Sequence, residues 1–141
     1  MKESSWKDCI DSFTARSITP DKEKAKSLVE TAYERIQQLR EVNEKTANFV
    51  FEDYYSSILE ILHAIVIVEG FKIENHLCIG FYLRDVLKRE DLFRFFDNCR
   101  FKRNSLVYYE KRMDFDTAKD AIDAAEKLLR ELKKIVTSSV P

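Results

Sequence analysis

The chain has 141 residues, of which 45% are hydrophobic and 35% charged, and its formal net charge at pH 7 is −1. This near-neutral balance argues against bulk electrostatic attraction to nucleic acid or to a membrane surface. Only two glycines and two prolines are present, so the chain has very few of the turn-forming residues that a β architecture needs. We therefore predict a single all-α domain over residues 1–141, an antiparallel up-and-down bundle of five to six helices with no β-sheet.

The first half of the chain predicts three helices, over residues 5–15, 20–42 and 47–69. Thr19 and Pro20 have the residue types of an N-cap and of the first helical position, so they place the start of the second helix. The third helix is the most apolar and is expected to be the most buried element. Gly70 is expected to end it in the left-handed conformation.

The second half predicts three more helices, over residues 76–88, 91–112 and about 114–136, followed by a frayed tail at 137–141. Asn75 has the residue type that caps the fourth helix. Glu90 and Asp91 place negative charge where the dipole of the fifth helix favours it. In the sixth helix, apolar residues recur every three or four positions, which predicts a seam for packing on another helix. The expected core covers about residues 20–136.

The cysteines and the apolar stretches indicate the cellular compartment in which the protein is expected to reside. Cys9, Cys78 and Cys99 are far apart and lie among apolar residues, which favours buried thiols in a reducing cytoplasm over a disulfide framework or a zinc site. The first residues lack the apolar run of a signal peptide. The longest apolar stretch, near 58–68, is too short and too interrupted to span a bilayer. We expect a cytoplasmic protein without membrane attachment, metal or cofactor.

Arg103 is the most informative residue, because it falls on the apolar face of the fifth predicted helix. That face carries Leu92, Phe96, Cys99, Leu106 and Met113. An arginine at an inward-facing position is costly unless it meets a carboxylate, a phosphate or a partner chain. Two interpretations stay open. Arg103 is either a structural residue paired with Glu110, or with Glu60 or Glu69 of the third helix, or it is an anion-binding residue.

The segment 84–112 forms a positive patch, because it holds nine basic and five acidic residues. Aromatic residues interleave with these charges, namely Phe93, Phe101, Tyr108 and Tyr109. Stacking side chains beside cations suit single-stranded RNA. The alternative is that the aromatic residues belong to the core or to a dimer interface, and that the cations form a solvated helix face.

The order of these features resembles the HEPN family of helical-bundle proteins over about residues 20–135. A buried helix with the sequence Tyr-Tyr-Ser-Ser at 54–57 leads to Gly70. His76 and a Phe-Tyr-Leu stretch at 81–83 follow, as in the family's passage of Gly, short turn, His and Phe-x-Leu.

The catalytic motif of the family is matched only in part. HEPN ribonucleases carry Arg, often a polar residue next, and then His after four to six positions. Here Arg103 and Asn104 match the first two, and Tyr108 stands in place of the histidine. Histidine suits proton transfer at neutral pH because its ordinary pKa is about 6.5, whereas a tyrosine titrates near 10. The three residues therefore favour holding a phosphate over base catalysis.

The resemblance implies a dimeric HEPN-like module that binds a nucleic acid, a nucleotide or a partner protein. It also implies that the chain can form the HEPN half of a toxin–antitoxin-type pair with a minimal nucleotidyltransferase. The alternative function is a metal-independent ribonuclease with Tyr108 in place of the usual histidine. In either case the expected site centres on Arg103, Asn104 and Tyr108, in a cleft between two chains.

Four further residues are expected to contribute to binding, namely Arg100, Lys102, Tyr109 and His76. His76 is either a structural helix-start residue or a base that approaches Arg103. A symmetric homodimer is expected because the apolar residues of the fifth helix exceed what one core can cover.

Overall fold

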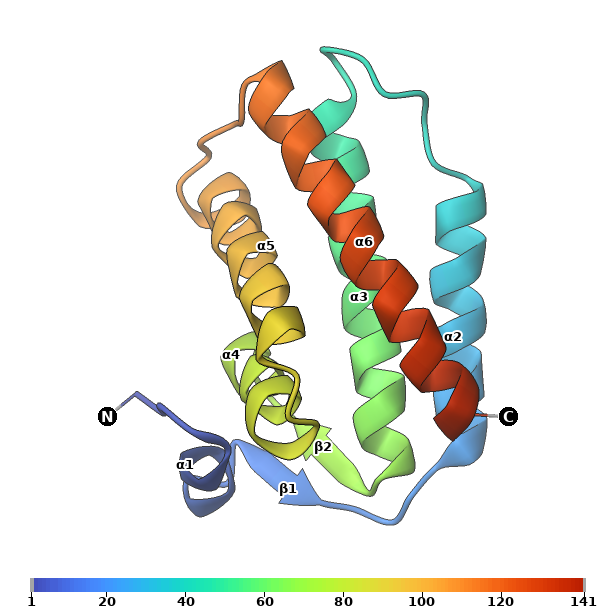
Figure 1. Cartoon of the computed structure of the whole chain (residues 1–141), viewed down its shortest axis with the longest axis vertical. Helices are drawn as coiled ribbons and strands as arrows, with labels where there is room; N and C mark the ends of the chain where they lie inside the picture. The colour runs from blue at the N-terminus through green and yellow to red at the C-terminus, as the bar shows by residue number, and fades with distance from the viewer. Residues whose placement is uncertain (1, 141) are drawn as a thin grey trace.

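The computed structural model describes residues 2–140, and over these residues the chain is mostly helical. The helices in chain order are α1 (Trp6–Asp11), α2 (Lys22–Gln37), α3 (Ala47–Val68), α4 (His76–Phe81), the π-helical turn η1 (Tyr82–Val86), α5 (Glu90–Tyr108) and α6 (Phe115–Ser139). The long helices α2, α3, α5 and α6 run alternately up and down (Figure 1). The predicted helical fold class is therefore confirmed.

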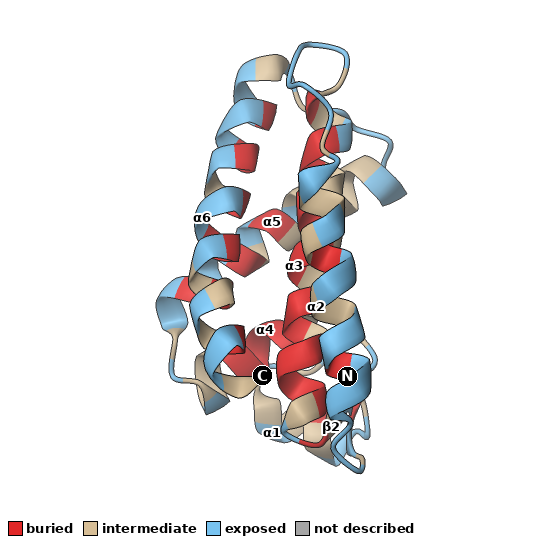
Figure 2. Ribbon diagram, turned by 90° about the vertical axis from the view of Figure 1, so that its right-hand side faces the viewer, coloured by how far each residue is buried: buried red, intermediate tan, exposed pale blue. Residues whose placement is uncertain are grey.

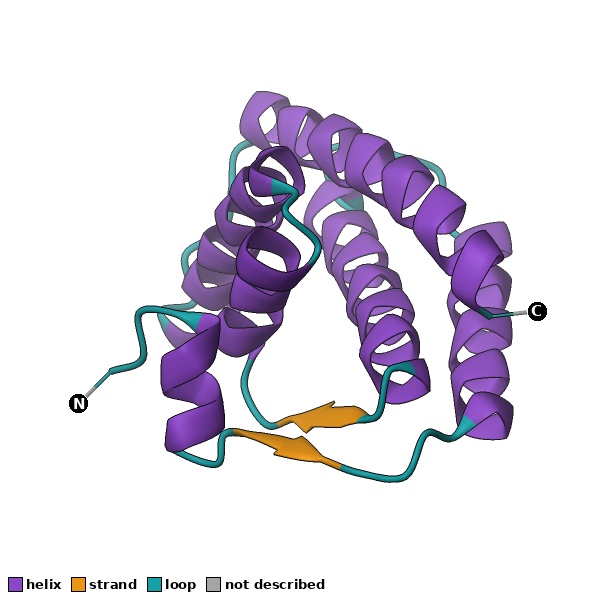
Figure 3. Ribbon diagram, turned by 60° about the horizontal axis from the view of Figure 1, so that its bottom comes forward, coloured by secondary structure: helices purple, strands orange, loops and turns teal. Residues whose placement is uncertain are grey.

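The expectation of no β-sheet was wrong. The strand β1 (Ala15–Ser17) pairs antiparallel with β2 (Phe71–Ile73), with Arg16 opposite Lys72, and the pair lies at one end of the bundle (Figure 3). The first helix correspondingly ends at Asp11, and Phe13 takes a left-handed φ of 61° in the turn that follows. Strands of three residues are too short for an alternating apolar pattern to be recognised in the sequence.

Helix boundaries agree with prediction where a cap is local. Gly70 has a φ of 88° after the end of α3, and Asn75 caps α4 by accepting a hydrogen bond from the Cys78 N–H at 2.8 Å. Asp114 likewise accepts from the Thr117 N–H at 2.8 Å and starts α6. These three signals depend only on neighbouring residues, which is why the sequence displays them.

Other boundaries were misplaced. The side chain of Asp21 caps α2 by accepting from the Lys24 N–H at 3.0 Å, so Pro20 precedes the helix. This helix stops at Gln37, earlier than predicted, and α5 stops at Tyr108. The C-terminal residues expected to fray continue α6 as far as Ser139.

The core is organised around α3, which packs against α2 on one side and against α6 on the other. Its buried residues run along most of the helix (Figure 2). Ser57 is the buried polar residue of the described core, and its hydroxyl donates to the Ala32 carbonyl of α2 at 3.0 Å. Within residues 2–140, no helix combines the length and the apolarity needed to cross a bilayer.

The expectation of three free thiols was also wrong. Cys9 of α1 and Cys78 of α4 form a disulfide, with their Cα atoms 6.0 Å apart, and only Cys99 of the three is a free, buried thiol. The two partners meet because the β1–β2 pairing folds α1 back beside α4. Disulfides persist in oxidising surroundings, so the bond does not support the predicted reducing compartment.

The disulfide joins positions 69 residues apart, and closing a loop of that length is expected to stabilise the fold by about 4 kcal/mol, mainly by restricting the unfolded chain. We expect dithiothreitol to lower the free energy of unfolding by about this amount, measured by urea denaturation of oxidised and reduced protein. A C9A/C78A variant should not respond to the reductant. Alkylation of all three cysteines in unfolded protein that was never reduced would contradict the bond.

Candidate functional site

A pocket of about 320 Å³ lies where α4, α5 and the N-terminal segment meet. Four of the residues expected in a functional site line it, namely His76, Arg100, Asn104 and Tyr108. The last three recur every four positions on α5, which places them on one face of the helix. The remaining lining residues are Lys2, Glu3, Glu74, Asn75 and Leu77.

His76 stands at the start of α4 and is held by α3. Its Nδ1 lies 3.0 Å from the hydroxyl of Tyr55. Burial raises the pKa of Tyr55 above its ordinary value, so the phenol stays protonated. Burial, and then the positive charge of Arg103, lower the pKa of His76 to about 4. The imidazole is therefore neutral at pH 7, and it reaches the pocket as a hydrogen-bonding group without charge.

Arg103, the expected centre of the site, does not line the pocket and is instead partly buried against Tyr55 of α3. Its guanidinium carbon is 5.7 Å from the centre of the Tyr55 ring, a cation–π contact. Among residues 2–140 it forms no ion pair with a carboxylate. Every buried side-chain nitrogen or oxygen of the described residues has a hydrogen-bond partner, so the unbonded guanidinium nitrogens of Arg103 must reach solvent.

None of the three carboxylates expected to pair with Arg103 forms an ion pair with it. Glu60 accepts hydrogen bonds from Arg35 of α2, with both of its oxygens 3.0 Å from Nη2. Glu110 follows the end of α5, is exposed, and has a left-handed φ of 52°. Glu69 is the exposed C-cap of α3. The interpretation of Arg103 as half of a salt bridge with any of these residues is therefore wrong.

The charges in the pocket lining balance. Arg100 donates to Asp97 at 2.8 Å, which already satisfies part of its guanidinium. Glu74 accepts from Arg16 at 2.7 Å, and Glu3 accepts from the Thr14 hydroxyl at 2.7 Å. Two cations and two carboxylates line the pocket in total. The lining is therefore polar with mixed sign rather than strongly positive.

Asn104 and Tyr108 contribute neutral groups whose side chains make no hydrogen bond with the rest of residues 2–140. Lys102 and Tyr109, also expected at the site, do not line the pocket. Lys102 is half-buried on α5, and Tyr109 is 78% exposed just after α5 ends. The helical period explains the division, because residues adjacent in a helix point in different directions.

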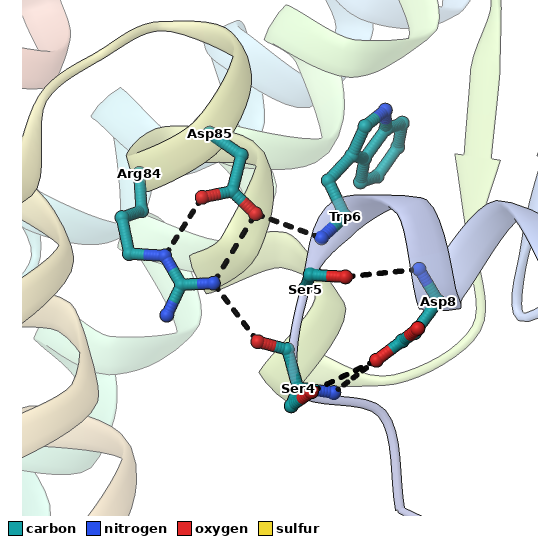
Figure 4. Close-up of polar contacts among 6 residues, drawn as sticks. All are labelled: Ser4, Ser5, Trp6, Asp8, Arg84 and Asp85. Atoms are coloured by element: carbon teal, nitrogen blue, oxygen red, sulfur yellow. Dashed lines mark hydrogen bonds and ion pairs between the residues drawn. The ribbon is translucent and has the colours of Figure 1, made fainter.

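The sequence did not predict the polar contacts that hold the N-terminal segment next to η1 (Figure 4). The Asp85 carboxylate accepts from the Trp6 N–H at 2.8 Å and from Arg84 Nε at 2.8 Å. Arg84 also donates to the Ser4 carbonyl at 2.9 Å. These bonds fix the chain just after Lys2 and Glu3, so the two charges stay beside α4. No local pattern signals a contact between positions 79 residues apart.

No family model, no curated protein and no solved structure matches this chain. Among residues 2–140, no three His, Cys, Asp or Glu side chains gather in a group able to hold a metal ion.

The lowered pKa of His76 predicts a stability that depends on pH. The pKa of His76 in the folded protein, about 4, lies below the ordinary histidine value of 6.5, so the unfolded chain binds more protons as the pH falls through this window. The stabilisation is fully present above pH 6.5 and is lost toward pH 4, by at most about 1.4 kcal/mol for each pH unit. Urea denaturation between pH 7.5 and pH 5 measures the slope.

The comparison variant is H76Q, which cannot titrate in this range. His63, whose pKa burial also lowers, remains in both proteins and leaves a residual slope. We expect the slope of H76Q to be smaller than that of the wild type. Identical slopes would assign the pH dependence to other groups.

Proposed function

We propose that the protein is a dimeric helical module of the HEPN type that binds a nucleotide or single-stranded RNA at the pocket of His76, Arg100, Asn104 and Tyr108. The observation that carries the proposal is Arg103, a partly buried guanidinium beside this pocket with no carboxylate partner among residues 2–140. A guanidinium in that position is suited to a phosphate, which it can hold through two parallel hydrogen bonds.

The composition of the pocket favours a nucleotide over a bare phosphate. Its volume of about 320 Å³ lies at the lower end of the range for small-molecule sites. Tyr108 is 68% exposed, so its ring is available for stacking on a base. Asn104 and Asn75 supply amide groups, and the carboxylates of Glu3 and Glu74 supply acceptors for amino groups of a base.

Exposed aromatic residues on α5 support the dimer. Phe101 and Tyr108 are each 68% exposed, and their spacing of seven residues puts them on one face of the helix. Phe96, on the inward apolar face of the same helix, is fully buried. A second copy packed on this face would cover the exposed rings of Phe101 and Tyr108. Since Tyr108 belongs both to this face and to the pocket, a dimer would build the site from two chains.

The HEPN resemblance supports one further partner. On the strength of the Arg103, Asn104 and Tyr108 pattern alone, a minimal nucleotidyltransferase is the proposed companion in a toxin–antitoxin-type pair.

A metal-independent ribonuclease is the second candidate. The observation that favours it is the shared pocket of His76 and Tyr108, because a neutral imidazole accepts protons far better than a phenol does. The low pKa of His76, about 4, makes it a weak base at neutral pH. Binding is therefore favoured over cleavage.

The variant R103A tests the binding site. We expect it to weaken binding of a fluorescein-labelled single-stranded RNA by at least tenfold in an anisotropy titration. The free energy of unfolding should fall by only about 1 kcal/mol, the size of a lost cation–π contact, because no carboxylate loses its partner.

The matched control is R94A on the same helix, whose side chain is 77% exposed and pairs with Glu90. Its RNA affinity should equal that of the wild type. Arg103 is instead a structural residue if R103A loses several kcal/mol of stability and either binds RNA as tightly as the wild type does, or the wild type itself shows no RNA binding.

The variant F101S tests the dimer. We expect the wild type to be dimeric in light scattering at micromolar concentration, and F101S to be monomeric, because it removes an apolar side chain from the proposed interface. F13S is the control, since Phe13 is 74% exposed in the turn after α1 and should leave the dimer intact. A monomeric wild type would refute the dimer.

An RNA cleavage assay separates the two candidate functions. If the protein only binds, wild type and R103A should leave a labelled RNA equally intact in the presence of EDTA. Cleavage by the wild type that is lost in both R103A and H76A would establish the ribonuclease.

A further inference from the structure

A second groove, of about 540 Å³, lies between the start of α5 and the C-terminal half of α6. Its lining carries four basic residues, Arg89, Lys127, Arg130 and Lys134, and two acidic residues, Asp91 and Glu131. The groove is therefore positive, whereas the charges of the pocket described above cancel. Phe95 of the groove and Asn104 of the pocket are nine residues apart, about half a turn around the helix. The two sites thus lie on opposite sides of α5.

We propose that this groove binds the phosphate backbone of a single-stranded nucleic acid. Lys127, Arg130 and Lys134 follow one another at intervals of three and four residues, so they form a row along one face of α6. The row spans about 10 Å at the rise of an α-helix. That length accommodates about two or three phosphates at a rise of ~3.4 Å or more per nucleotide.

Two cations of the row are not neutralised within the protein. Lys134 lies 3.2 Å from Glu131. Arg89 lies 3.0 Å from Asp91 and 3.8 Å from Glu131, so both of these cations are paired with carboxylates. Lys127 and Arg130 form no ion pair among the described residues and are exposed. Binding of phosphates to them would release condensed counterions from the nucleic acid without first breaking a salt bridge.

Phe95 indicates a nucleic acid rather than an acidic protein segment. Its ring is 39% exposed, whereas Leu92, the other apolar lining residue, is buried at 1% exposure. A protein segment would need a pocket for an apolar anchor, and one exposed ring beside cations does not provide it. Such a ring does suit the stacking of a base next to a contacted phosphate.

The groove does not depend on the proposed function, because none of its lining residues belongs to the pocket. It remains a possible binding surface if the pocket proves to bind something else, and the pocket proposal survives if the groove binds nothing. The two proposals therefore need variants that separate them.

The test variant is K127Q/R130Q, which removes the two cations without a carboxylate partner. The control K22Q/K45Q removes the same charge from exposed positions at the start of α2 and before α3. The probe is a labelled single-stranded oligouridine of twelve nucleotides, titrated by anisotropy in 50 to 200 mM salt. Circular dichroism and urea denaturation verify that each variant is folded as the wild type is.

We expect K127Q/R130Q to bind at least tenfold more weakly than the control at 50 mM salt. The slope of log K against log salt concentration should become less steep by about 1.4, because each single-strand phosphate contact contributes about 0.7. The control should retain the wild-type affinity and slope.

Equal affinity and slope in K127Q/R130Q and the control would overturn the proposal. So would displacement of the RNA by polyglutamate as readily as by unlabelled oligouridine, because the groove would then recognise negative charge alone. R103A separates the two sites. Weakening by R103A with no effect of K127Q/R130Q leaves the pocket and rejects the groove, and the reverse pattern supports the groove and rejects the pocket as the RNA site.

Discussion

The burial of α3 between α2 and α6 is the constraint on which the other features depend. Two faces of this helix pack against α2 and α6, and a third faces α4 and α5. Tyr55 lies on that third face, where its ring stacks on Phe96 of α5 with centroids 6.0 Å apart. Its hydroxyl meets His76 at 3.0 Å, and its ring lies beneath Arg103. A single core side chain therefore positions the histidine and the arginine of the candidate site relative to each other.

The position of Arg103 over Tyr55 explains how an inward-facing arginine is tolerated without a carboxylate partner. Full burial of an unpaired charge would cost several kcal/mol, and a cation–π contact returns only about 1 to 2 kcal/mol. Arg103 therefore keeps its unbonded guanidinium nitrogens in reach of water while the guanidinium carbon lies over the Tyr55 ring of α3. Its uncancelled charge acts on His76 and contributes to the low pKa of that residue. An anion bound beside Arg103 would cancel this effect and favour the protonated imidazole.

The features that the sequence could predict are those set by neighbouring residues. The caps at Asn75 and Asp114 and the left-handed Gly70 follow from local hydrogen bonding and sterics, and the helical period aligned Arg100, Asn104 and Tyr108. The disulfide, the β1–β2 pair and the Arg84–Asp85 contact with the N-terminal segment join positions far apart in the chain. Nothing in the residue spacing encodes such contacts, and scattered cysteines therefore indicated free thiols. The spacing of Lys127, Arg130 and Lys134 is visible in the sequence, but the basic groove was missed because this row meets Arg89 and Phe95 of α5 only in the folded chain.

The two surfaces of α5 differ in how their charges are screened. Beside the pocket, Arg103 is partly buried over Tyr55. The two carboxylates of the pocket lining, Glu3 and Glu74, are each bonded to a neighbouring side chain, so salt should weaken the binding of an anion there only modestly. In the groove, Lys127 and Arg130 are exposed, and their attraction to a polyanion should fall steeply as counterions compete. A protein with both surfaces would bind a strand through the groove at low salt and would retain a single nucleotide in the pocket at higher salt. The salt dependence of binding thus reports which side of the helix is occupied, even though the net charge of the whole chain is only −1.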